Sequence, residues 1–353
     1  MRTHAVAVIP GDGIGQEVMP EAIAVVDALG SAHGFSMAWK EFPWSCAYYA
    51  QHGAMMPEDG LDQLKPFDAI LLGAVGLPSL PDHVSLWGLL IPIRRAFQQY
   101  VNLRPCRLLD GIQSPLRGRG REDIDLIVVR ENTEGEYSEI GGRIYAGTDQ
   151  EMAIQESVFT KTGVDRILRY AFERAQGRPR KHLTSATKSN GIVHTMPFWD
   201  ERFAEVLQDY PDVETARFHI DILVSHFIQH PDWFDVVVAS NLFGDILSEI
   251  GPSIAGSIGI APSGNINPEG LYPSMFEPVH GSAPDIAGQH IANPMGMIWS
   301  AAMMLEHLGE TKAAAAIENA LNAVCGAGAT LTPDLGGTAS TGELGKAVID
   351  RLA

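Results

Sequence analysis

Cysteine is scarce in this chain of 353 residues. The three cysteines, Cys46, Cys106 and Cys325, are widely spaced and odd in number. They therefore predict neither a disulfide framework nor a zinc site built from closely spaced ligands. The sequence also lacks an apolar run long enough to cross a bilayer, and the apolar run at its N-terminus is too short for a signal peptide. We expect a cytoplasmic protein with no membrane partner.

Basic residues are also fewer than acidic residues in this chain. The chain has 25 lysine and arginine residues against 43 aspartate and glutamate residues, which gives a formal net charge of −18. This balance argues against nucleic acids and anionic membranes as partners, so an anionic substrate would require a local cluster of cations. The apolar content of 45% and the length of the chain predict a globular protein with two domains or lobes.

Strand-like apolar runs alternate with helical patterns along the chain, which predicts an α/β architecture with mixed or parallel sheets. The expected strands are Ala5–Ile9, Ala69–Leu72, Asp125–Val129 and Asp235–Ala239. The expected helices are Glu17–Leu29, which Gly30 would end, and the alanine-rich segments Ala301–Leu308 and Ala313–Val324. The charged or glycine-containing segments 117–123 and 177–181 are expected to be exposed connections.

The glycine-rich segment Val8–Gly15 is similar to the dinucleotide-binding fingerprint of Rossmann folds but does not match it. The third glycine of that fingerprint would fall at Gln16, and no acidic residue ends a clear second strand about 20 residues later. Two interpretations remain open. The segment is either a tight turn that brings the backbone close to a ligand or a turn with a structural role only.

Two carboxylates follow the last expected strand. The segment Val236–Gly251 predicts a buried strand that turns directly into a helix, with Ser240 or Asn241 as its cap. Asp245 and Glu249 are four residues apart, so they share one helix face, where like charges repel unless a cation lies between them. Such a pair suits Mg²⁺ or Mn²⁺. The alternative, a solvated acidic surface, is disfavoured because ligands bind near strand ends in α/β proteins.

Three arginines are candidates for an anion-binding site. Arg94 and Arg104 lie in the stretch IRRAFQQYVNLRP, and Arg130 ends an apolar strand. An arginine at the end of a buried strand needs an anionic partner, and three converging guanidinium groups would suit a dicarboxylic acid. For Arg95 and Arg121 we expect ordinary salt bridges to the many acidic residues.

The segment Phe276–Gly288 is expected to be a long irregular loop, because it is dense in glycine and proline. It offers backbone donors, the imidazole of His280 and the carboxylate of Asp285. The loop would either clasp an adenosine, with Asp285 accepting hydrogen bonds from the ribose hydroxyls as in other NAD sites, or serve as a stiff connection.

Taken together, these segments resemble the β-decarboxylating dehydrogenase family, which includes isopropylmalate, isocitrate and tartrate/D-malate dehydrogenases. The resemblance covers essentially the whole chain. It implies an α/β fold of two domains with mixed sheets, which is distinct from the Rossmann fold. Residues 1–104 and 257–353 would form the large, cofactor-binding domain, residues 105–256 would form the small domain with the dimer interface, and the active site would lie between the two domains.

The resemblance also implies roles for individual residues. Arg94, Arg104 and Arg130 would hold the substrate carboxylates, with Trp87 and Leu90 nearby. Tyr137 would be the general acid, and Lys188 would reach across a homodimer into the neighbouring active site. The implied metal ligands are Asp245, Glu249, where the family more often has aspartate, and Asp221 from the partner subunit. The residues implied for cofactor binding are Asn190, Glu277, His280, Gly281, Ser282, Ala283, Asp285 and Asn293.

The implied reaction is the NAD-dependent oxidation of a small 2-hydroxydicarboxylate with Mn²⁺ or Mg²⁺. The metal would acidify the 2-hydroxyl group, Lys188 would take its proton, and hydride transfer to NAD would leave a 2-keto acid. A carboxylate β to the ketone can leave as CO2, after which Tyr137 would protonate the enolate at C3. A requirement for a monovalent cation such as K⁺ stays open.

The residues before the first arginine favour the tartrate/D-malate branch of the family. The run Ser85–Leu90 reads SLWGLL, and Trp87 adds bulk where isopropylmalate enzymes usually present an acidic residue, although Leu90 keeps apolar surface. An isopropylmalate dehydrogenase is the main alternative. A dicarboxylate-binding protein without catalysis is disfavoured by the metal pair together with Lys188 and Tyr137.

Two further expectations concern single residues. Pro92 would kink the helix that carries Arg94 and shift that side chain unless it lies in the first helical turn. Asp285, with the uncharged Ile286 beside it, predicts NAD rather than NADP, because a carboxylate would repel the 2′-phosphate.

Overall fold

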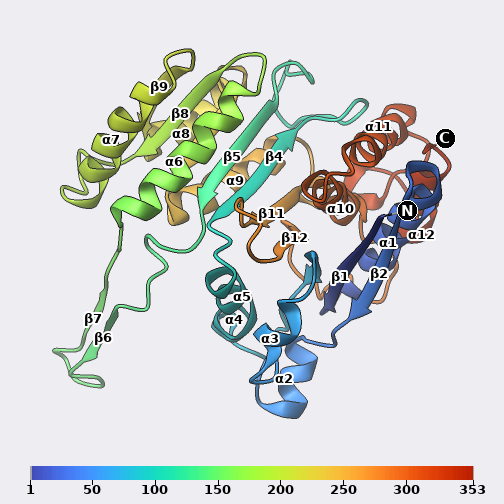
Figure 1. Ribbon diagram of the computed structural model, residues 1–353, viewed down its shortest axis with the longest axis horizontal. Coiled ribbons are helices and arrows are strands. Elements are labelled where there is room, and N and C mark those ends of the chain that lie inside the picture. Colours follow the sequence, from blue (N-terminus) through green and yellow to red (C-terminus); the bar gives the residue numbers. More distant parts are fainter. Residues whose placement is uncertain (1, 353) are drawn as a thin grey trace.

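The computed structural model describes residues 2–352 and is built around one sheet of ten strands (Figure 1). The order of the strands is β2-β1-β3-β12-β11-β4-β5-β10-β8-β9. Their bounds are β1 Arg2–Gly11, β2 Phe35–Glu41, β3 Ala69–Ala74, β4 Val101–Arg107, β5 Asp125–Glu131, β8 His182–Thr187, β9 Glu214–His219, β10 Val236–Ala239, β11 Pro262–Ile266 and β12 Ser274–Pro278.

The sheet is mixed. The strands at each end pair in parallel, whereas β11 and β4 pair antiparallel with each other and β4 pairs antiparallel with β5. The predicted α/β architecture with a mixed sheet is therefore confirmed. All four expected strands are present as parts of β1, β3, β5 and β10.

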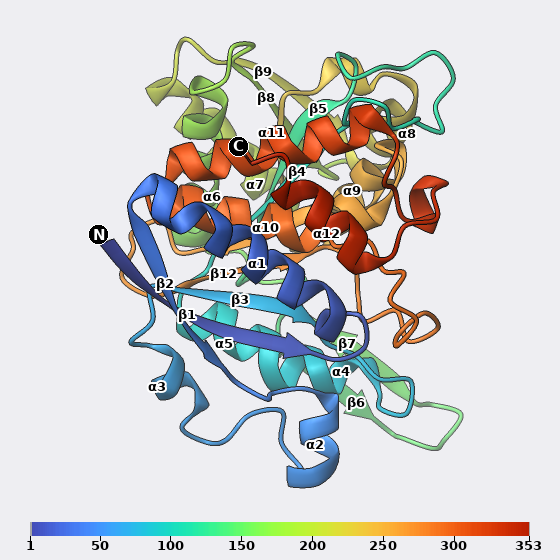
Figure 2. The same ribbon diagram turned by 90° about the vertical axis from the view of Figure 1, so that its right-hand side faces the viewer.

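Helices cover both faces of the sheet (Figure 2). Along β1, Val8 packs into the apolar cluster around α1, and the next residue, Ile9, packs on the other side against Ile93, because successive side chains of a strand point to opposite faces. The first face carries α1 Gly15–His33, α6 Lys161–Gln176, α7 Thr195–Val206, α10 Met295–His307, α11 Thr311–Ala327 and α12 Thr341–Ile349. The second carries α2 Cys46–His52, α3 Gly60–Leu64, α4 Asp82–Ser85, α5 Ile91–Ala96, α8 Ile220–Gln229 and α9 Asn241–Ile254.

Two sequence-based boundaries are wrong. Helix α1 continues to His33 and is capped by Gly34 in the left-handed conformation, so Gly30 does not end it. Gly30 lies inside the helix at a close approach, since an added Cβ atom would be 2.9 Å from the carbonyl oxygen of Phe35. The loop expected from Phe276 begins later, because Phe276–Pro278 belongs to β12. The segments 117–123 and 177–181 are mostly exposed, as expected.

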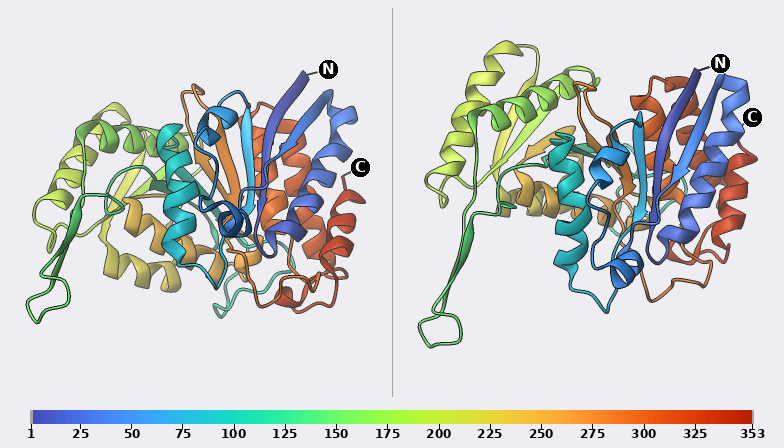
Figure 3. Two further views of the ribbon diagram at one scale, coloured as in Figure 1. Left: turned by 90° about the horizontal axis from the view of Figure 1, so that it is seen from below. Right: turned by 60° about the horizontal axis from the view of Figure 1, so that its bottom comes forward.

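A hairpin extends from the body of the molecule (Figures 1 and 3). It consists of β6 Gly141–Ile144 and β7 Met152–Gln155, which pair antiparallel. Its apolar side chains are exposed, including Ile144, Tyr145, Met152 and Ile154. The three cysteines are buried and form no disulfide, and among the helices of residues 2–352 none has the length and apolar character that crossing a membrane requires.

Candidate active site

Strands β4 and β5 bring two of the predicted arginines to the same face of the sheet. Arg104 lies opposite Val128 and Arg130 lies opposite Asn102, and residues directly opposite in an antiparallel pair point to the same side. Both arginine side chains are buried. Helix α9 packs on this face so closely that a Cβ atom at Gly244 would be 2.6 Å from the Cβ atom of Arg130. The neighbouring carboxylate of Asp245 therefore lies beside Arg130.

The carboxylate of Asp245 is the point where the predicted site residues meet. Its Oδ1 atom forms an ion pair with Nη1 of Arg130 and lies 3.9 Å from Nη1 of Arg104. Its Oδ2 atom accepts a hydrogen bond of 2.9 Å from the phenol of Tyr137. The structure thus brings a predicted metal ligand, two predicted substrate-binding residues and the predicted general acid into one cluster.

Glu249 lies on the same face of α9, and its nearest cation is Arg104. The distance from Nη1 of Arg104 to Oε1 of Glu249 is 3.4 Å. The same nitrogen donates a hydrogen bond of 2.7 Å to Oγ of Ser248. The repulsion between Asp245 and Glu249 is therefore partly offset by the arginine that lies between them.

Arg94 enters the cluster from α5 and is held by Glu277. Its Nη2 atom lies 2.7 Å from Oε1 of Glu277, and the same oxygen accepts a hydrogen bond of 2.7 Å from Asn265. Pro92 is the second residue of α5, which continues without a break from the π-helical residues Leu86–Leu90, so the wider π-helical turn lies where the proline cannot donate a hydrogen bond. Arg94 stays buried in its ion pair.

Asn265 connects this pair to the strands that carry the other arginines. Its Oδ1 atom accepts hydrogen bonds from the side-chain amides of Asn102, two residues before Arg104, and Asn132, two residues after Arg130. A buried network of this kind fixes the relative positions of the three arginines.

The charges of the cluster shift several pKa values. Burial raises the pKa of Tyr137, and the charge of Asp245 raises it further, so the phenol keeps its proton at neutral pH. Burial also raises the pKa of Glu249, with a further contribution from Asp245. Burial opposes ionisation of Asp245, but the charges of Arg130, Arg104 and Arg94 outweigh it and lower the pKa of that carboxyl group. All three arginines therefore act on the same carboxylate.

Sequence reasoning missed two residues that orient Arg130 and α9. The Oδ1 atom of Asn241 accepts hydrogen bonds from Nε and Nη2 of Arg130, at 3.1 and 2.7 Å. The cap expected from Ser240 or Asn241 is provided instead by Glu136, whose carboxylate accepts hydrogen bonds from the backbone N–H of Leu242 and from Oγ of Ser240. The role of Asn241 could have been inferred from its helical spacing with Asp245 and Ser248, which places all three residues on one face of the helix.

Lys188 and Asp221 form a second group, apart from Asp245. Lys188 follows β8 and Asp221 lies in the first turn of α8, where their side chains form an ion pair of 2.7 Å. Within residues 2–352, Lys188 forms no ion pair with Asp245, and no group of three or more His, Cys, Asp or Glu side chains is placed to hold a metal ion. Asp221 is therefore not grouped with Asp245 and Glu249 within one copy of the chain. Asn190 is exposed near Lys188.

The predicted cofactor loop packs against the glycine-rich turn after β1. The backbone N–H of Ile14 donates to the carbonyl oxygen of Ser282 at 2.9 Å, and a Cβ atom at Gly13 would lie 2.0 Å from that oxygen. Ala283 has a positive φ of 39°, while Asp285 and Gly281 are exposed. Asn293 donates to Asp334 at 3.0 Å. The turn and the loop thus form one surface made largely of backbone.

His280 is the buried side chain of this surface. Its Nδ1 atom lies 3.0 Å from the carbonyl oxygen of Gly281, which requires the proton on Nδ1. Burial lowers the pKa of His280, so the ring is neutral. Its Nε2 atom has no hydrogen-bond partner among residues 2–352 and is left as an acceptor for a ligand.

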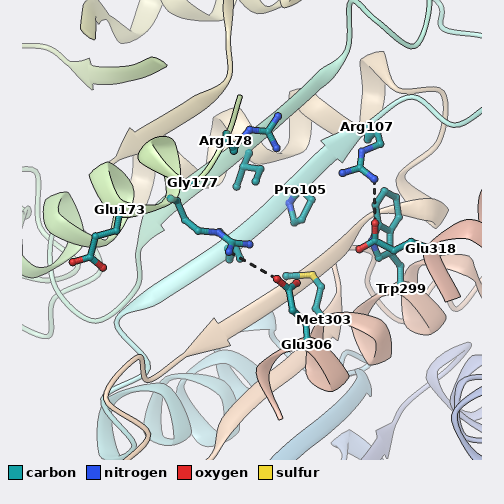
Figure 4. A pocket seen from close by; sticks show the side chains of 12 residues that line it. Pro105, Arg107, Glu173, Gly177, Arg178, Trp299, Met303, Glu306 and Glu318 are labelled. Atoms are coloured by element: carbon teal, nitrogen blue, oxygen red, sulfur yellow. Dashed lines mark hydrogen bonds and ion pairs between the residues drawn. The ribbon is translucent and has the colours of Figure 1, made fainter. Parts of the chain in front are cut away.

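The other face of the sheet has a groove of about 280 Å³ between α6 and α10 (Figure 4). It is lined by the alternate residues of β4, such as Pro105 and Arg107, which point away from Arg104. Four of its charged groups form two ion pairs, Arg107 with Glu318 at 3.1 Å and Arg174 with Glu306 at 3.9 Å. Because it contains none of the predicted site residues, the cluster around Asp245 is the better candidate for the active site.

Comparison with known proteins identifies the family. The model of the isocitrate/isopropylmalate dehydrogenase family matches residues 5–348. The chain belongs to this family. Among its relatives, D-malate dehydrogenase [decarboxylating] of Escherichia coli (strain K12) is 56% identical, over 99% of this chain and 98% of the relative. Tartrate dehydrogenase/decarboxylase of Pseudomonas putida is also 56% identical, over 99% and 97%.

The solved structures agree with this assignment. Isocitrate dehydrogenase from Methylococcus capsulatus has a TM-score of 0.89 and 34% sequence identity, with 99% of both chains covered. The resemblance drawn from the sequence, including a family fold distinct from the Rossmann fold, is therefore confirmed, and the chain is a dehydrogenase of this family.

The contact between Gly244 and Arg130 yields a prediction for this dehydrogenase. Gly244→Ala should lower the free energy of unfolding by about 1–3 kcal/mol, because the added methyl group overpacks the interface between α9 and β5. Urea denaturation measures the change. Gly177→Ala is a matched control, since its Cβ atom would meet its nearest neighbours at an ordinary 3.6 Å. Equal stability of the two variants would contradict the close packing of α9.

Proposed function

We propose that the chain oxidises D-malate or tartrate with NAD and a divalent metal ion, and that it converts D-malate to pyruvate and CO2. The observation that carries this proposal is the approach of Arg104 and Arg130 to Asp245, with the phenol of Tyr137 bonded to the same carboxylate and Arg94 held nearby by Glu277. Such a cluster offers cations for two carboxylates and an acid for the reacting carbon. The names of the most similar relatives support the choice of substrate.

In this proposal the arginines bind and orient the substrate. When a dicarboxylate binds, its carboxylates replace the protein carboxylates as ion-pair partners of the arginines. The guanidinium groups then hold the substrate carboxylates in a fixed geometry. Lys188 accepts the proton of the substrate hydroxyl group, and NAD, when bound, would supply the hydride acceptor. Tyr137, which keeps its proton next to Asp245, donates that proton to C3 after CO2 has left.

The acidic pair on α9 fits a divalent cation. Asp245 and Glu249 supply hard oxygen ligands on one helix face, as Mg²⁺ and Mn²⁺ prefer. Burial and the charge of Asp245 raise the pKa of Glu249, and a cation bound between the two carboxylates would oppose both effects. When bound there, the ion would supply Lewis-acid polarisation of the substrate oxygen atoms.

We also propose a homodimer in which each active site takes Lys188 and Asp221 from the partner. The separation of these two residues from Asp245 within one chain supports sharing. Exposed apolar side chains support an interface, on the hairpin of β6 and β7 and on the adjacent helices α8 and α9, where Ile222, Ile228 and Ile246 are exposed. A twofold interface would bring Lys188 and Asp221 of each copy to Asp245 of the other.

The proposal of NAD as cofactor rests on the loop 279–293. The unpaired Nε2 atom of His280 and the exposed backbone of Gly281 suit the recognition of an adenosine. Asp285 is exposed beside them, where its carboxylate would accept hydrogen bonds from ribose hydroxyls and repel a 2′-phosphate.

Turnover can be tested through NADH absorbance at 340 nm with Mn²⁺. We expect kcat/KM with D-malate to exceed that with 3-isopropylmalate, because Trp87 crowds a branched substituent, and kcat/KM with NAD to exceed that with NADP about a hundredfold. Asp285→Asn should reduce the preference for NAD, whereas the matched exposed variant Glu58→Gln should keep it. A preference for 3-isopropylmalate would contradict the proposed substrate. Equal kcat/KM with NAD and NADP would contradict the proposed cofactor.

Sharing of the active sites can be tested by complementation. Lys188→Ala and Arg104→Ala should each be inactive as homodimers. In a heterodimer one site would carry both lesions and the other none, so co-refolded mixtures should recover about a quarter of wild-type activity at random pairing.

The matched control for complementation pairs Arg104→Ala with Arg130→Ala. Both lesions belong to the same set of residues, so each site of that heterodimer keeps one lesion and no activity should return. Absence of recovery in the first mixture, despite demonstrated heterodimers, would argue against shared sites.

A further inference from the structure

Arg95 contacts two separate parts of the site, the loop that carries Tyr137 and Glu139 and the ring of Trp87. Its Nη2 atom donates to the backbone carbonyl of Tyr137 at 2.9 Å, and its Nη1 atom lies 2.5 Å from Glu139. Its guanidinium carbon is 5.1 Å from the ring centroid of Trp87. The ion pair with Glu139 agrees with the salt bridge expected from the sequence, but the other two contacts go beyond it.

The position of Arg95 on α5 separates it from the substrate-binding arginine. Arg94 is buried against Glu277, whereas the side chain of Arg95 is 31% exposed and reaches toward the loop after β5. Consecutive residues of a helix point in different directions, about a quarter of a turn apart. Helix α5 therefore holds an internal carboxylate with one arginine and the loop of Tyr137 with the next.

The loop that carries Tyr137 is held from several directions. Glu136 caps α9, and Oγ of Ser138 donates to the carbonyl oxygen of Glu156. The phenol of Tyr137 is bonded to Asp245. Arg95, from α5, adds a hydrogen bond to the backbone of Tyr137 itself. This bond restrains the direction in which the phenol can point.

Trp87 is the second residue that Arg95 restrains. It lies in the π-helical segment Leu86–Leu90, where the guanidinium group of Arg95 faces its ring within the range of a cation–π contact. Arg95 thus contacts both Trp87, the residue proposed to limit the size of the substrate, and the backbone of Tyr137, the proposed proton donor.

We propose that Arg95 is a positioning residue that aims the phenol of Tyr137 and fixes the ring of Trp87 at the same time. The inference rests on the proposed function of Tyr137 and Trp87. In the step concerned, the bond from C3 to the departing carboxylate breaks, its electron pair enters the enolate and CO2 leaves. C3 then takes the phenolic proton of Tyr137, and solvent returns a proton to the phenolate.

The experiment compares Arg95→Ala, Arg95→Lys and the control Glu139→Gln, which removes the ion pair but keeps the contacts to Tyr137 and Trp87. In single turnovers with D-malate, Arg95→Ala should form NADH at nearly the wild-type rate and pyruvate about 10–100-fold more slowly, because the proton donor is misplaced. Its preference for D-malate over 3-isopropylmalate should fall several-fold. Arg95→Lys should recover only part of the rate of pyruvate formation and of the substrate preference, since an ammonium group cannot replace the planar guanidinium fork.

A second measurement does not depend on activity. Amide hydrogen exchange in peptides covering residues 133–140 should be faster in Arg95→Ala than in the wild type and in Glu139→Gln, while exchange in α6 should stay unchanged. Unchanged exchange in the loop would overturn the inference, and so would an equal loss of NADH and pyruvate formation. If the wild-type protein does not oxidise D-malate, the proposed function fails, and the exchange result still decides whether Arg95 restrains the loop.

Discussion

The charge balance around Asp245 holds the candidate site together. Arg130 is only 3% exposed, and Asp245 is its ion-pair partner, so its charge would be buried without a counter-charge if that carboxylate were absent. Arg104, which is 9% exposed, would keep only Glu249 at 3.4 Å. Asp245 joins a strand, a helix and a loop, because Arg130 comes from β5, Asp245 from α9 and Tyr137 from the segment that follows β5. Geometry and protonation state in the site both depend on this one group.

The packing of α9 makes that charge balance possible. Gly244 allows the helix to lie directly on Arg130, and Asn241 accepts two hydrogen bonds from the same guanidinium group. Glu136 then caps α9 from the loop of Tyr137. Tyr137, the proposed general acid, and the acidic pair on α9 are therefore connected through Glu136, so a change in the loop would affect the helix.

The sequence predicted those features that local periodicity determines. Asp245 and Glu249 share a helix face because they are four residues apart. Arg130 follows an apolar run and lies near the end of a buried strand, although that strand continues to Glu131. The role of Asn241 was missed, since an asparagine at a helix start is explained equally well as a cap. Only the tertiary position of Glu136 shows that the cap is taken by another residue.

The expectations for Gly30 and Arg95 were incomplete because tertiary contacts decide the positions of both residues. Gly30 satisfies the pattern of a helix terminator, but its place is decided by contact with Phe35 on the neighbouring strand. For Arg95 the many acidic residues of the chain predict only an ordinary salt bridge. Its contacts with Tyr137 and Trp87 depend on where α5 meets the loop after β5. Roles that the family resemblance implies for Lys188 and Asp221 require a second copy of the chain.

The central claim is that Asp245 binds both the substrate arginines and a divalent cation. The most direct test is the affinity for Mn²⁺ in the presence of D-malate, followed through the electron paramagnetic resonance signal of free Mn²⁺ in the wild type and in Asp245→Asn. The account predicts that the substitution weakens binding at least about tenfold while the protein stays folded. Equal affinity in the two proteins would contradict it.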